Sequence, residues 1–239
     1  MADGARNDLT IYDTHAAAWW SDEVRWVRTL KNMVPARLRH FDGYTDWEGA
    51  EVLDLGCAGG FMAEALHDRG ARLQGIDPAA EAIAAAKAHA EATGREIGYA
   101  VGVGEALPYA TDSFDAVVCV DVLEHVADLP RVLGEVARVL RPGGWFFFDT
   151  INRTRLARFA VVTMAEDVLG LLPRGTHDPA LFIRPRDLLA GLSGLGFVTA
   201  PLTGLGPIGV NRRLDPVFGR VPFQWIIYMG AARLTPLPD

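Results

Sequence analysis

Glu51-Val-Leu-Asp-Leu-Gly-Cys-Ala-Gly-Gly60 is the stretch that decides the fold of this chain. Residues 51–55 are mostly apolar and predict a short strand, and the glycine-rich residues 56–60 predict a turn. Residues 61–69 predict a helix that ends before Gly70, because glycine tolerates the left-handed backbone that often follows a helix. A strand, a glycine turn and a helix in this order are typical of the first unit of a parallel α/β sheet.

The alternation of strands and helices continues to residue 150. Strands are predicted at residues 72–76, 97–101, 114–120 and 145–150, and helices at 79–93 and 128–140. The stretch Phe114–Val120 is continuously apolar, as expected for a strand that is buried on both faces. The sequence therefore predicts a doubly wound, Rossmann-like α/β fold with a mostly parallel sheet and helices on both faces.

The rest of the chain is expected to flank this core within one domain of residues 1–239. Its predicted parts are an N-terminal helical cap (1–48), the core (49–150), a helical insertion over the substrate site (151–183) and a C-terminal helix with strands (184–239). In the cap, residues 1–14 are polar and expected to be frayed or lid-like, and Pro35 marks a break or a new start of the helix.

The last third of the chain departs from strict alternation. Helices are predicted at residues 153–172 and 184–195, and late strands at 197–205 and 224–233. Residues 206–223 leave open whether these strands are joined by a hairpin or by a crossover, which would make them antiparallel or parallel.

Composition excludes several classes of protein. Half of the 239 residues are hydrophobic and 22% are charged, which excludes a disordered chain. No apolar run approaches the ~20 residues of a membrane-spanning helix, and the N-terminus lacks the apolar stretch of a secretory signal. A net charge of −7 argues against a nucleic-acid partner. Cys57 and Cys119 are too few for a disulfide framework. We therefore expect a cytoplasmic protein with free thiols.

The glycine turn predicts a nucleotide site. Ligands of open α/β sheets bind outside the carboxyl ends of the strands, where the strand order reverses. The turn allows a ligand to approach the backbone, and Asp77 after the second strand can accept hydrogen bonds from both ribose hydroxyls. A dinucleotide oxidoreductase would require the order Gly-x-Gly-x-x-Gly. Residues 56–60 read Gly-Cys-Ala-Gly-Gly and lack that order.

With Asp54 before its first glycine, this segment resembles motif I of the class I S-adenosylmethionine (SAM) methyltransferases. Residues 105–115 and 138–144 resemble two further segments of the same family. The resemblance implies SAM as cofactor, S-adenosylhomocysteine as product, and Asp54 at the methionine amino end. Since Val103 stands where the family has an acid, adenine contacts are expected from the backbone around Gly104 and Glu105. A non-catalytic SAM-binding scaffold is the alternative to an enzyme.

Segments outside the core resemble a narrower family, the ubiquinone-biosynthesis O-methyltransferases, which methylate polyprenyl catechols. The matching segments are Tyr12-Asp13, Ala18-Trp19-Trp20, residues 34–38, Arg174-Gly-Thr-His-Asp178 and residues 203–205. The resemblance implies O-methylation of a phenolic or catecholic quinone precursor, with another small aromatic or natural product as the alternative acceptor. It also implies that the SAM site is lined by Arg37, Gly56, Gly60, Asp77 and Val120.

Asp121-Val-Leu-Glu124-His125 follows the fourth strand of the core. If this segment is helical, Asp121, Glu124 and His125 share one face, which would point into the ligand crevice. Two carboxylates and an imidazole could bind Mg²⁺ or another divalent cation, or Glu124 and His125 could simply shape the pocket. The family resemblance relates the three residues to an acid–x–x–Glu-His group implicated in metal binding in some members.

A phenolic acceptor requires a group that removes its proton, because a free phenol has a pKa near ~10. His125, beside Glu124, is the first candidate for this catalytic role, either directly or through a bound cation. His177 is the second candidate. Asp178-Pro179 also predicts a helix N-cap followed by proline, which would explain the turn at His177 without chemistry.

Residues 153–172 combine apolar side chains with Arg153, Arg155 and Arg158. A helix of this composition could make a peripheral contact with the anionic inner face of a membrane, or roof an apolar pocket. Ordinary packing against the domain is the alternative.

Overall fold

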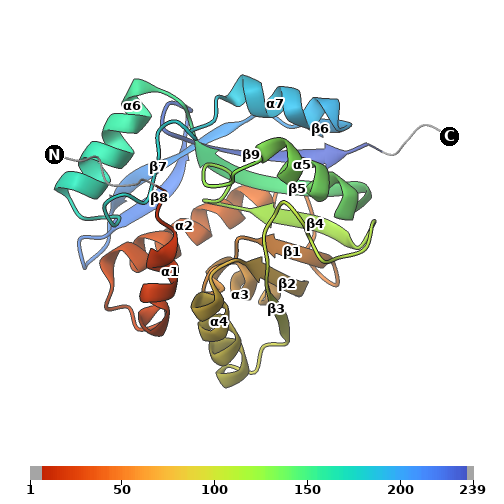
Figure 1. The fold of residues 1–239 in the computed structure, drawn as a ribbon, viewed down its shortest axis with the longest axis horizontal. Coiled ribbons are helices and arrows are strands. Elements are labelled where there is room, and N and C mark those ends of the chain that lie inside the picture. The colour runs from red at the N-terminus through yellow and green to blue at the C-terminus, as the bar shows by residue number, and fades with distance from the viewer. Residues whose placement is uncertain (1–6, 236–239) are drawn as a thin grey trace.

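The structure is a computed structural model that describes residues 7–235. The first residues of the expected N-terminal cap, 1–6, and the last residues of the expected C-terminal segment, 236–239, lie outside the described part. A nine-stranded sheet has the order β3-β2-β1-β4-β5-β9-β7-β8, and β6 also pairs with β9 (Figure 1). The core strands and the C-terminal strands are therefore continuous in one sheet.

The first five strands are parallel, as the sequence predicts. They are β1 (Glu51–Leu55), β2 (Arg72–Asp77), β3 (Ile97–Val101), β4 (Phe114–Cys119) and β5 (Leu140–Ile151). The order of strands reverses between β1 and β4, because β2 lies on one side of β1 and β4 on the other. This reversal opens a crevice at the carboxyl ends of the two strands.

Helices cover both faces of the sheet (Figure 1). One face packs against α2 (Arg25–Phe41), α3 (Phe61–His67) and α4 (Ala80–Ala92), and the other against α5 (Leu129–Val139) and α7 (Pro185–Gly194). Successive residues of β4 alternate between the two cores, with Ala116 and Val118 in the first and Val117 and Cys119 in the second. This alternation explains why β4 is apolar throughout. The doubly wound fold predicted from the sequence is confirmed.

The expected break at Pro35 is wrong, because α2 runs without interruption from Arg25 to Phe41. Buried side chains on both sides of the proline, such as Trp26, Met33 and Phe41, anchor the two halves of the helix. Pro35 itself is exposed, so water can serve the carbonyl that loses its helical hydrogen bond. Before α2, residues form the short helices α1 (Thr10–Thr14) and η1 (Ala16–Ala18).

The turn at residues 142–144 lies inside β5 rather than before it. Helix α5 ends at Val139 and the strand begins at Leu140, five residues earlier than predicted. The register with β4 shifts between Phe114 and Ala116, next to this irregular part of the strand. A Cβ on Gly144 would lie 2.9 Å from the backbone oxygen of Asp115, so the close approach of the two strands requires glycine there.

The C-terminal strands close the sheet by antiparallel pairing. They are β6 (Phe197–Thr199), β7 (Thr203–Val210), β8 (Pro216–Val221) and β9 (Ile227–Leu234). The connection that the sequence left open is a hairpin between β7 and β8. The single strand predicted at residues 197–205 is instead divided into β6 and the start of β7.

The helical insertion is shorter than predicted. Helix α6 (Arg155–Ala157) continues directly into η2 (Arg158–Val168), which is π-helical. The segment ends before Gly170, whose φ of 58° is left-handed, rather than at residue 172. Its inner side packs on Ile151 and Phe182. Within residues 7–235, no helix combines the length and apolar character needed to cross a membrane.

Candidate functional site

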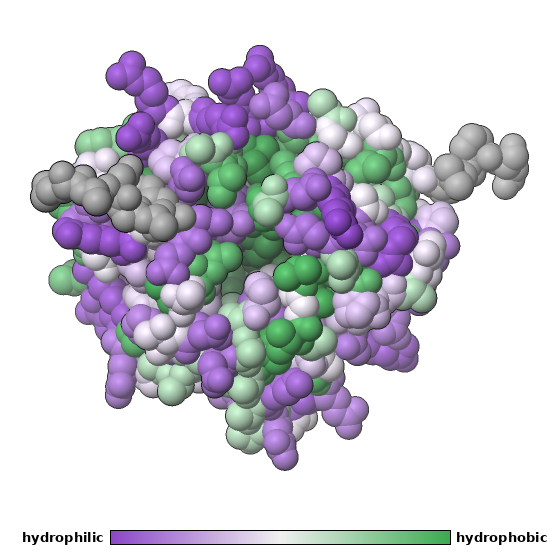
Figure 2. All heavy atoms as spheres, viewed as in Figure 1, coloured by the Kyte–Doolittle hydropathy of each residue, from purple (hydrophilic) through white to green (hydrophobic). Residues whose placement is uncertain are grey.

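A cavity of about 600 Å³ lies at the carboxyl ends of β1, β2 and β4, at the reversal of strand order. Figure 2 shows that this face of the molecule is hollowed near its centre, where hydrophobic residues gather. Most of the residues that the sequence predicts for the cofactor contribute to the cavity wall. They are Arg37, Asp54, Gly56, Asp77, Gly104, Glu105 and Val120, and Asp121 and His125 join them.

The glycine turn is held by close contacts on both sides. Gly56 has a φ of +77°, and a Cβ there would lie 2.1 Å from a methyl group of Val122. A Cβ on Gly59 would lie 2.2 Å from the ring of Trp19. Gly60 begins α3 with a φ of +92° and backs onto Tyr99, outside the cavity wall. Gly60 therefore has a role in the turn itself, and its expected contact with the cofactor stays a prediction.

Asp54 is a buried carboxylate in the cavity wall. Its side chain is 1% exposed, and neither oxygen has a partner with normal hydrogen-bond geometry among residues 7–235. Burial, with a contribution from the nearby Asp77, raises the pKa of Asp54 to about 7, although the backbone N–H of Ala63 favours the ionised form. A buried acid of this kind has an unmet demand for a cationic donor. The ammonium group of SAM fits this demand.

Asp77 links β2 to the glycine turn. One carboxylate oxygen accepts a hydrogen bond from the backbone N–H of Ala58 (2.9 Å), and the other from that of Ala79 (2.8 Å). A carboxylate has about four acceptor positions, so capacity for two ribose hydroxyls remains. Burial raises the pKa of Asp77 above its usual value.

Arg37 reaches the cavity from α2 and pairs with two acids. Its Nε donates to Asp149 (2.5 Å), and its Nη2 lies 2.6 Å from Asp121. The other oxygen of Asp149 accepts the backbone N–H of Asp121 (2.8 Å). Burial lowers the pKa of Arg37, but the two acids outweigh it and the net pKa is raised. Sequence reasoning missed Asp149, although a lone acid in the apolar stretch 145–150 is a signal that could have found it.

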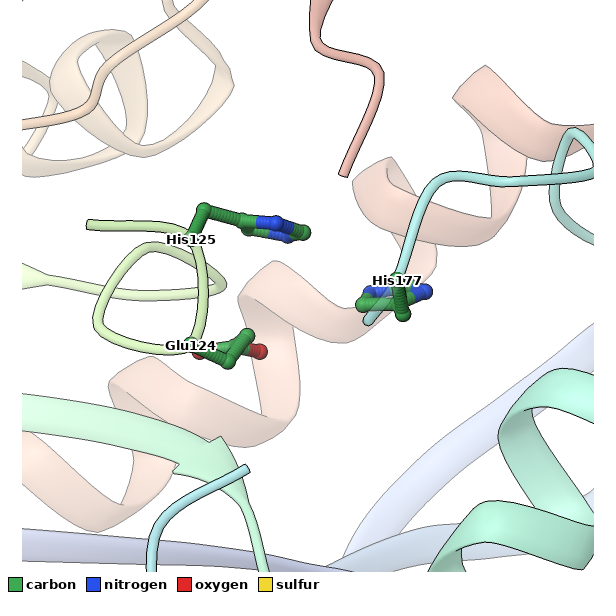
Figure 3. A group of neighbouring side chains, drawn as sticks. All are labelled: Glu124, His125 and His177. Atoms are coloured by element: carbon green, nitrogen blue, oxygen red, sulfur yellow. The ribbon is translucent and has the colours of Figure 1, made fainter. Parts of the chain in front are cut away.

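The predicted helical face of Asp121, Glu124 and His125 is wrong. Residues 121–125 form an irregular turn, and Asp121 has a left-handed φ of 56°. Because Arg37 holds Asp121, this acid is drawn away from the other two residues. Glu124 and His125 instead meet His177 from the insertion, and one ligand atom of each lies within 4.8 Å of the others. Figure 3 shows Glu124 and His125 pointing from their loop toward His177.

The three residues of this cluster are oriented by hydrogen bonds. Thr150 donates to one oxygen of Glu124 (2.8 Å), Asn7 lies 2.6 Å from Nδ1 of His125, and His177 Nδ1 lies 2.8 Å from Glu166. The second oxygen of Glu124 and Nε2 of His125 are buried, and among the described residues no hydrogen-bond partner reaches them.

Burial sets the charge states of Glu124 and His125. It raises the pKa of Glu124 to about 8, with Asp121 and Asp149 adding to the rise. It lowers the pKa of His125 to about 3, with His177 adding to the fall. His125 is therefore a neutral imidazole at pH 7, so its buried nitrogen can accept a hydrogen bond or ligate a cation if it carries the lone pair.

A divalent cation fits the same groups. One carboxylate oxygen and two imidazole nitrogens are a common donor set for a divalent ion. Two of the three residues, Glu124 and His125, have a buried side-chain atom without a hydrogen-bond partner among the described residues. His177 and Glu124 do not contribute to the wall of the large cavity, whereas His125 does. His125 is thus the member of the cluster that faces both sites.

Sequence comparison relates the chain to methyltransferases. The methyltransferase domain family matches residues 53–148. A ubiquinone biosynthesis O-methyltransferase from Thiobacillus denitrificans is 39% identical over 211 residues, which cover 87% of this chain and 90% of that protein. A second protein of this name, from Chromobacterium violaceum, is 38% identical over 208 residues, covering 86% and 88%. The similarity thus extends well beyond the strands of the core.

Structural comparison gives the same fold. A SAM-dependent methyltransferase from Thermotoga maritima matches with a TM-score of 0.64 and 17% identity, covering 93% of this chain and all of that chain. A SAM-dependent methyltransferase from Aquifex aeolicus matches with a TM-score of 0.60 and 14% identity, covering 84% of this chain and 94% of that one. At these identities the likeness supports the fold alone.

Proposed function

The chain belongs to the family of ubiquinone biosynthesis O-methyltransferases, and from this premise we propose that it methylates a phenolic or catecholic oxygen of a quinone precursor. It is a SAM-dependent methyltransferase. The observation that carries the proposal is a cavity with two buried groups in its wall: the acid Asp54, which has no side-chain partner among residues 7–235, and the neutral imidazole of His125.

The roles of the cavity residues follow from their charges. Asp54 binds the ammonium group of SAM. Arg37 has five N–H donors. The donors that do not pair with Asp121 or Asp149 face the methionine carboxylate. Asp77 accepts hydrogen bonds from the ribose, and the backbone at Gly104 and Glu105 faces the adenine.

SAM supplies a methyl group that is already activated by the sulfonium charge. A bond forms between this carbon and the acceptor oxygen as the carbon–sulfur bond breaks, and S-adenosylhomocysteine leaves. The cavity aligns the two reactants, and orientation of this kind can contribute ~7–11 kcal/mol. His125 takes the phenolic proton on Nε2, the nitrogen that is buried without a partner in the described chain.

A divalent cation would be held by Glu124, His125 and His177, rather than by Asp121. It would supply positive charge that acidifies a catechol at neutral pH. In that case Thr150 and Glu166 act by holding Glu124 and His177 in place. The direct route through His125 and the cation route predict different effects of a chelator.

Acceptor profiling tests the proposed function. The full chain, purified with SAM, is expected to transfer a labelled methyl group to a prenylated catechol at a rate at least about tenfold above that for small soluble phenols. The physical reason is that the apolar part of the cavity and its rim favour an apolar acceptor, and burial of about two methylenes already provides such a ratio. Product mass spectrometry is the measurement. A preference for soluble phenols would favour a natural-product acceptor instead.

We further propose that the insertion contacts the anionic inner face of a membrane, where a prenylated acceptor would reside. Leu156 and Phe159 are 44% and 54% exposed on the outer side of the insertion, and each directly follows an exposed arginine, Arg155 or Arg158. The loop before β9 lies against the start of the insertion, because Thr154 donates a hydrogen bond to the backbone of Trp225. Apolar side chains among arginines are typical of peripheral membrane contacts.

Liposome flotation tests this contact. Phe159→Glu combined with Leu156→Glu is expected to reduce binding to phosphatidylglycerol vesicles at least about tenfold, because the change removes apolar area and repels anionic lipid. Val198→Glu is the matched control, since Val198 is 63% exposed on β6, which lies away from α6 in Figure 1. Equal flotation of all three proteins would contradict the contact. If Val198→Glu also reduces vesicle binding, the reduction would reflect the added negative charge rather than the loss of apolar area from the insertion.

A further inference from the structure

Asn7 makes two contacts with His125. Its side-chain amide donates a hydrogen bond to the backbone oxygen of His125 (3.1 Å), and its side-chain oxygen lies 2.6 Å from Nδ1 of the ring. The opposite orientation of the amide would place its oxygen against the backbone oxygen of His125, where neither atom carries a proton. The orientation with both contacts satisfied is therefore the one in which Oδ1 faces the ring.

This orientation determines the tautomer of His125. An amide oxygen can only accept, so Nδ1 of the ring must carry the proton. In a neutral imidazole the lone pair then lies on Nε2. Nε2 is the nitrogen that is buried without a partner in residues 7–235, and His125 lines the large cavity. The contact with Asn7 therefore uses Nδ1 of the ring and leaves Nε2 as the nitrogen that can accept.

Asn7 belongs to a segment that also forms part of the cavity wall. Asn7, Leu9 and Tyr12 line the cavity, and the backbone N–H of Asp8 donates to Gly175 (3.2 Å). At the other end of the segment, Asp13 accepts the backbone N–H of Glu81 (2.9 Å). Within it, the ring of Tyr12 in helix α1 packs against Trp19 and Trp26 of the hydrophobic core. Residues 7–13 are therefore held in the cavity wall by this packing and by the hydrogen bonds at their two ends.

We propose that Asn7 is a positioning residue that sets the accepting tautomer of His125. The inference rests on the proposed role of His125 in O-methylation. Without the two contacts to Asn7 the ring could adopt either tautomer, and only the one protonated on Nδ1 has its lone pair on Nε2.

Three variants of the full chain test this inference. Asn7→Ala removes both contacts, and is expected to lower kcat by about 10- to 100-fold, the range seen when a partner that orients a histidine is lost. The dissociation constant for SAM is expected to change less than threefold. Asn7→Asp keeps an acceptor for Nδ1 but has no donor for the backbone oxygen, so it is expected to restore most of kcat. Thr14→Ala, at the end of helix α1 and outside the cavity wall, is the matched control.

The tautomer is measured directly by ¹⁵N NMR of ring-labelled histidine in the chelator-treated complex with S-adenosylhomocysteine. The wild type and Asn7→Asp are expected to show a protonated Nδ1 and an unprotonated Nε2 for His125, and Asn7→Ala a mixture of tautomers. An unchanged His125 spectrum in Asn7→Ala would overturn the inference, as would an Asp variant no more active than the Ala variant. Failure of the wild type to methylate any catechol would instead count against the proposed function, and the spectra would still decide the role of Asn7.

Discussion

Asp54→Asn is expected to weaken SAM binding by at least about 30-fold, because truncating one partner of a buried charge pair costs about 2–5 kcal/mol. Asp54 is 1% exposed and its oxygens have no other side-chain partner in the described chain, so nothing replaces the lost charge. Isothermal titration calorimetry with SAM and with S-adenosylhomocysteine provides the measurement. Both ligands carry the ammonium group, so both should lose affinity to a similar extent.

The same substitution is expected to stabilise the protein without ligand. The pKa of Asp54 is about 7 when folded and 3.8 in the reference state, so the folded protein binds the proton more tightly. The free energy of unfolding therefore falls as pH rises from about 4 to about 7, and Asp54→Asn lacks this loss. At pH 8 we expect a gain of about 1–3 kcal/mol for the variant, measured by urea unfolding. At pH 5 the gain should be much smaller.

A pH titration of SAM binding separates this explanation from a general disturbance of the site. Only ionised Asp54 pairs with an ammonium group, so the affinity of the wild type should fall as pH drops below about 7. Asp77→Asn is the matched control, because it should weaken binding through the ribose while retaining the same pH dependence. A wild-type affinity that is flat between pH 5.5 and 8 would be inconsistent with an Asp54–ammonium pair.

The parts of this site that could be predicted lie at the ends of strands. Asp54 and Asp77 belong to β1 and β2, and Gly56 follows β1 directly, so local patterns of apolar residues and glycine were enough to place them. Parallel strands end at one edge of the sheet, which brings these residues together whatever the rest of the chain does. For the same reason, the cavity at the reversal of strand order could be predicted before its shape was known.

The parts that could not be predicted depend on distant residues. Asp121 was expected beside Glu124 and His125, but Arg37, 84 positions earlier in the chain, holds it through an ion pair. His177 takes its place because the insertion folds back over the loop after β4. No local pattern contains information about either contact. Pro35 shows the same effect in the fold, since tertiary packing keeps α2 continuous where local propensity predicts a break.

His125→Gln is expected to lower kcat by about 100-fold or more while the dissociation constant for SAM stays within about threefold. A positioned general base typically contributes 10²–10⁴-fold, and glutamine cannot accept a proton at neutral pH. Because the pKa of His125 is about 3, the imidazole stays neutral between pH 6 and 8. At saturating SAM, kcat should therefore show no loss from protonation of His125 over this range. In contrast, kcat/KM for SAM should fall as the pH drops below about 7, because Asp54 becomes protonated.

His177→Gln distinguishes the two routes by which His125 could act. If His125 takes the proton directly, its own substitution is much the more damaging, and a chelator leaves the wild-type rate unchanged. If a cation is held by Glu124, His125 and His177, the two histidine variants should lose similar activity, and the chelator should reproduce their effect until Mg²⁺ is restored. Mn²⁺ binding followed by electron paramagnetic resonance adds a readout independent of turnover. Full activity of His125→Gln with and without chelator would exclude both routes and move the search for the base to another part of the cavity wall.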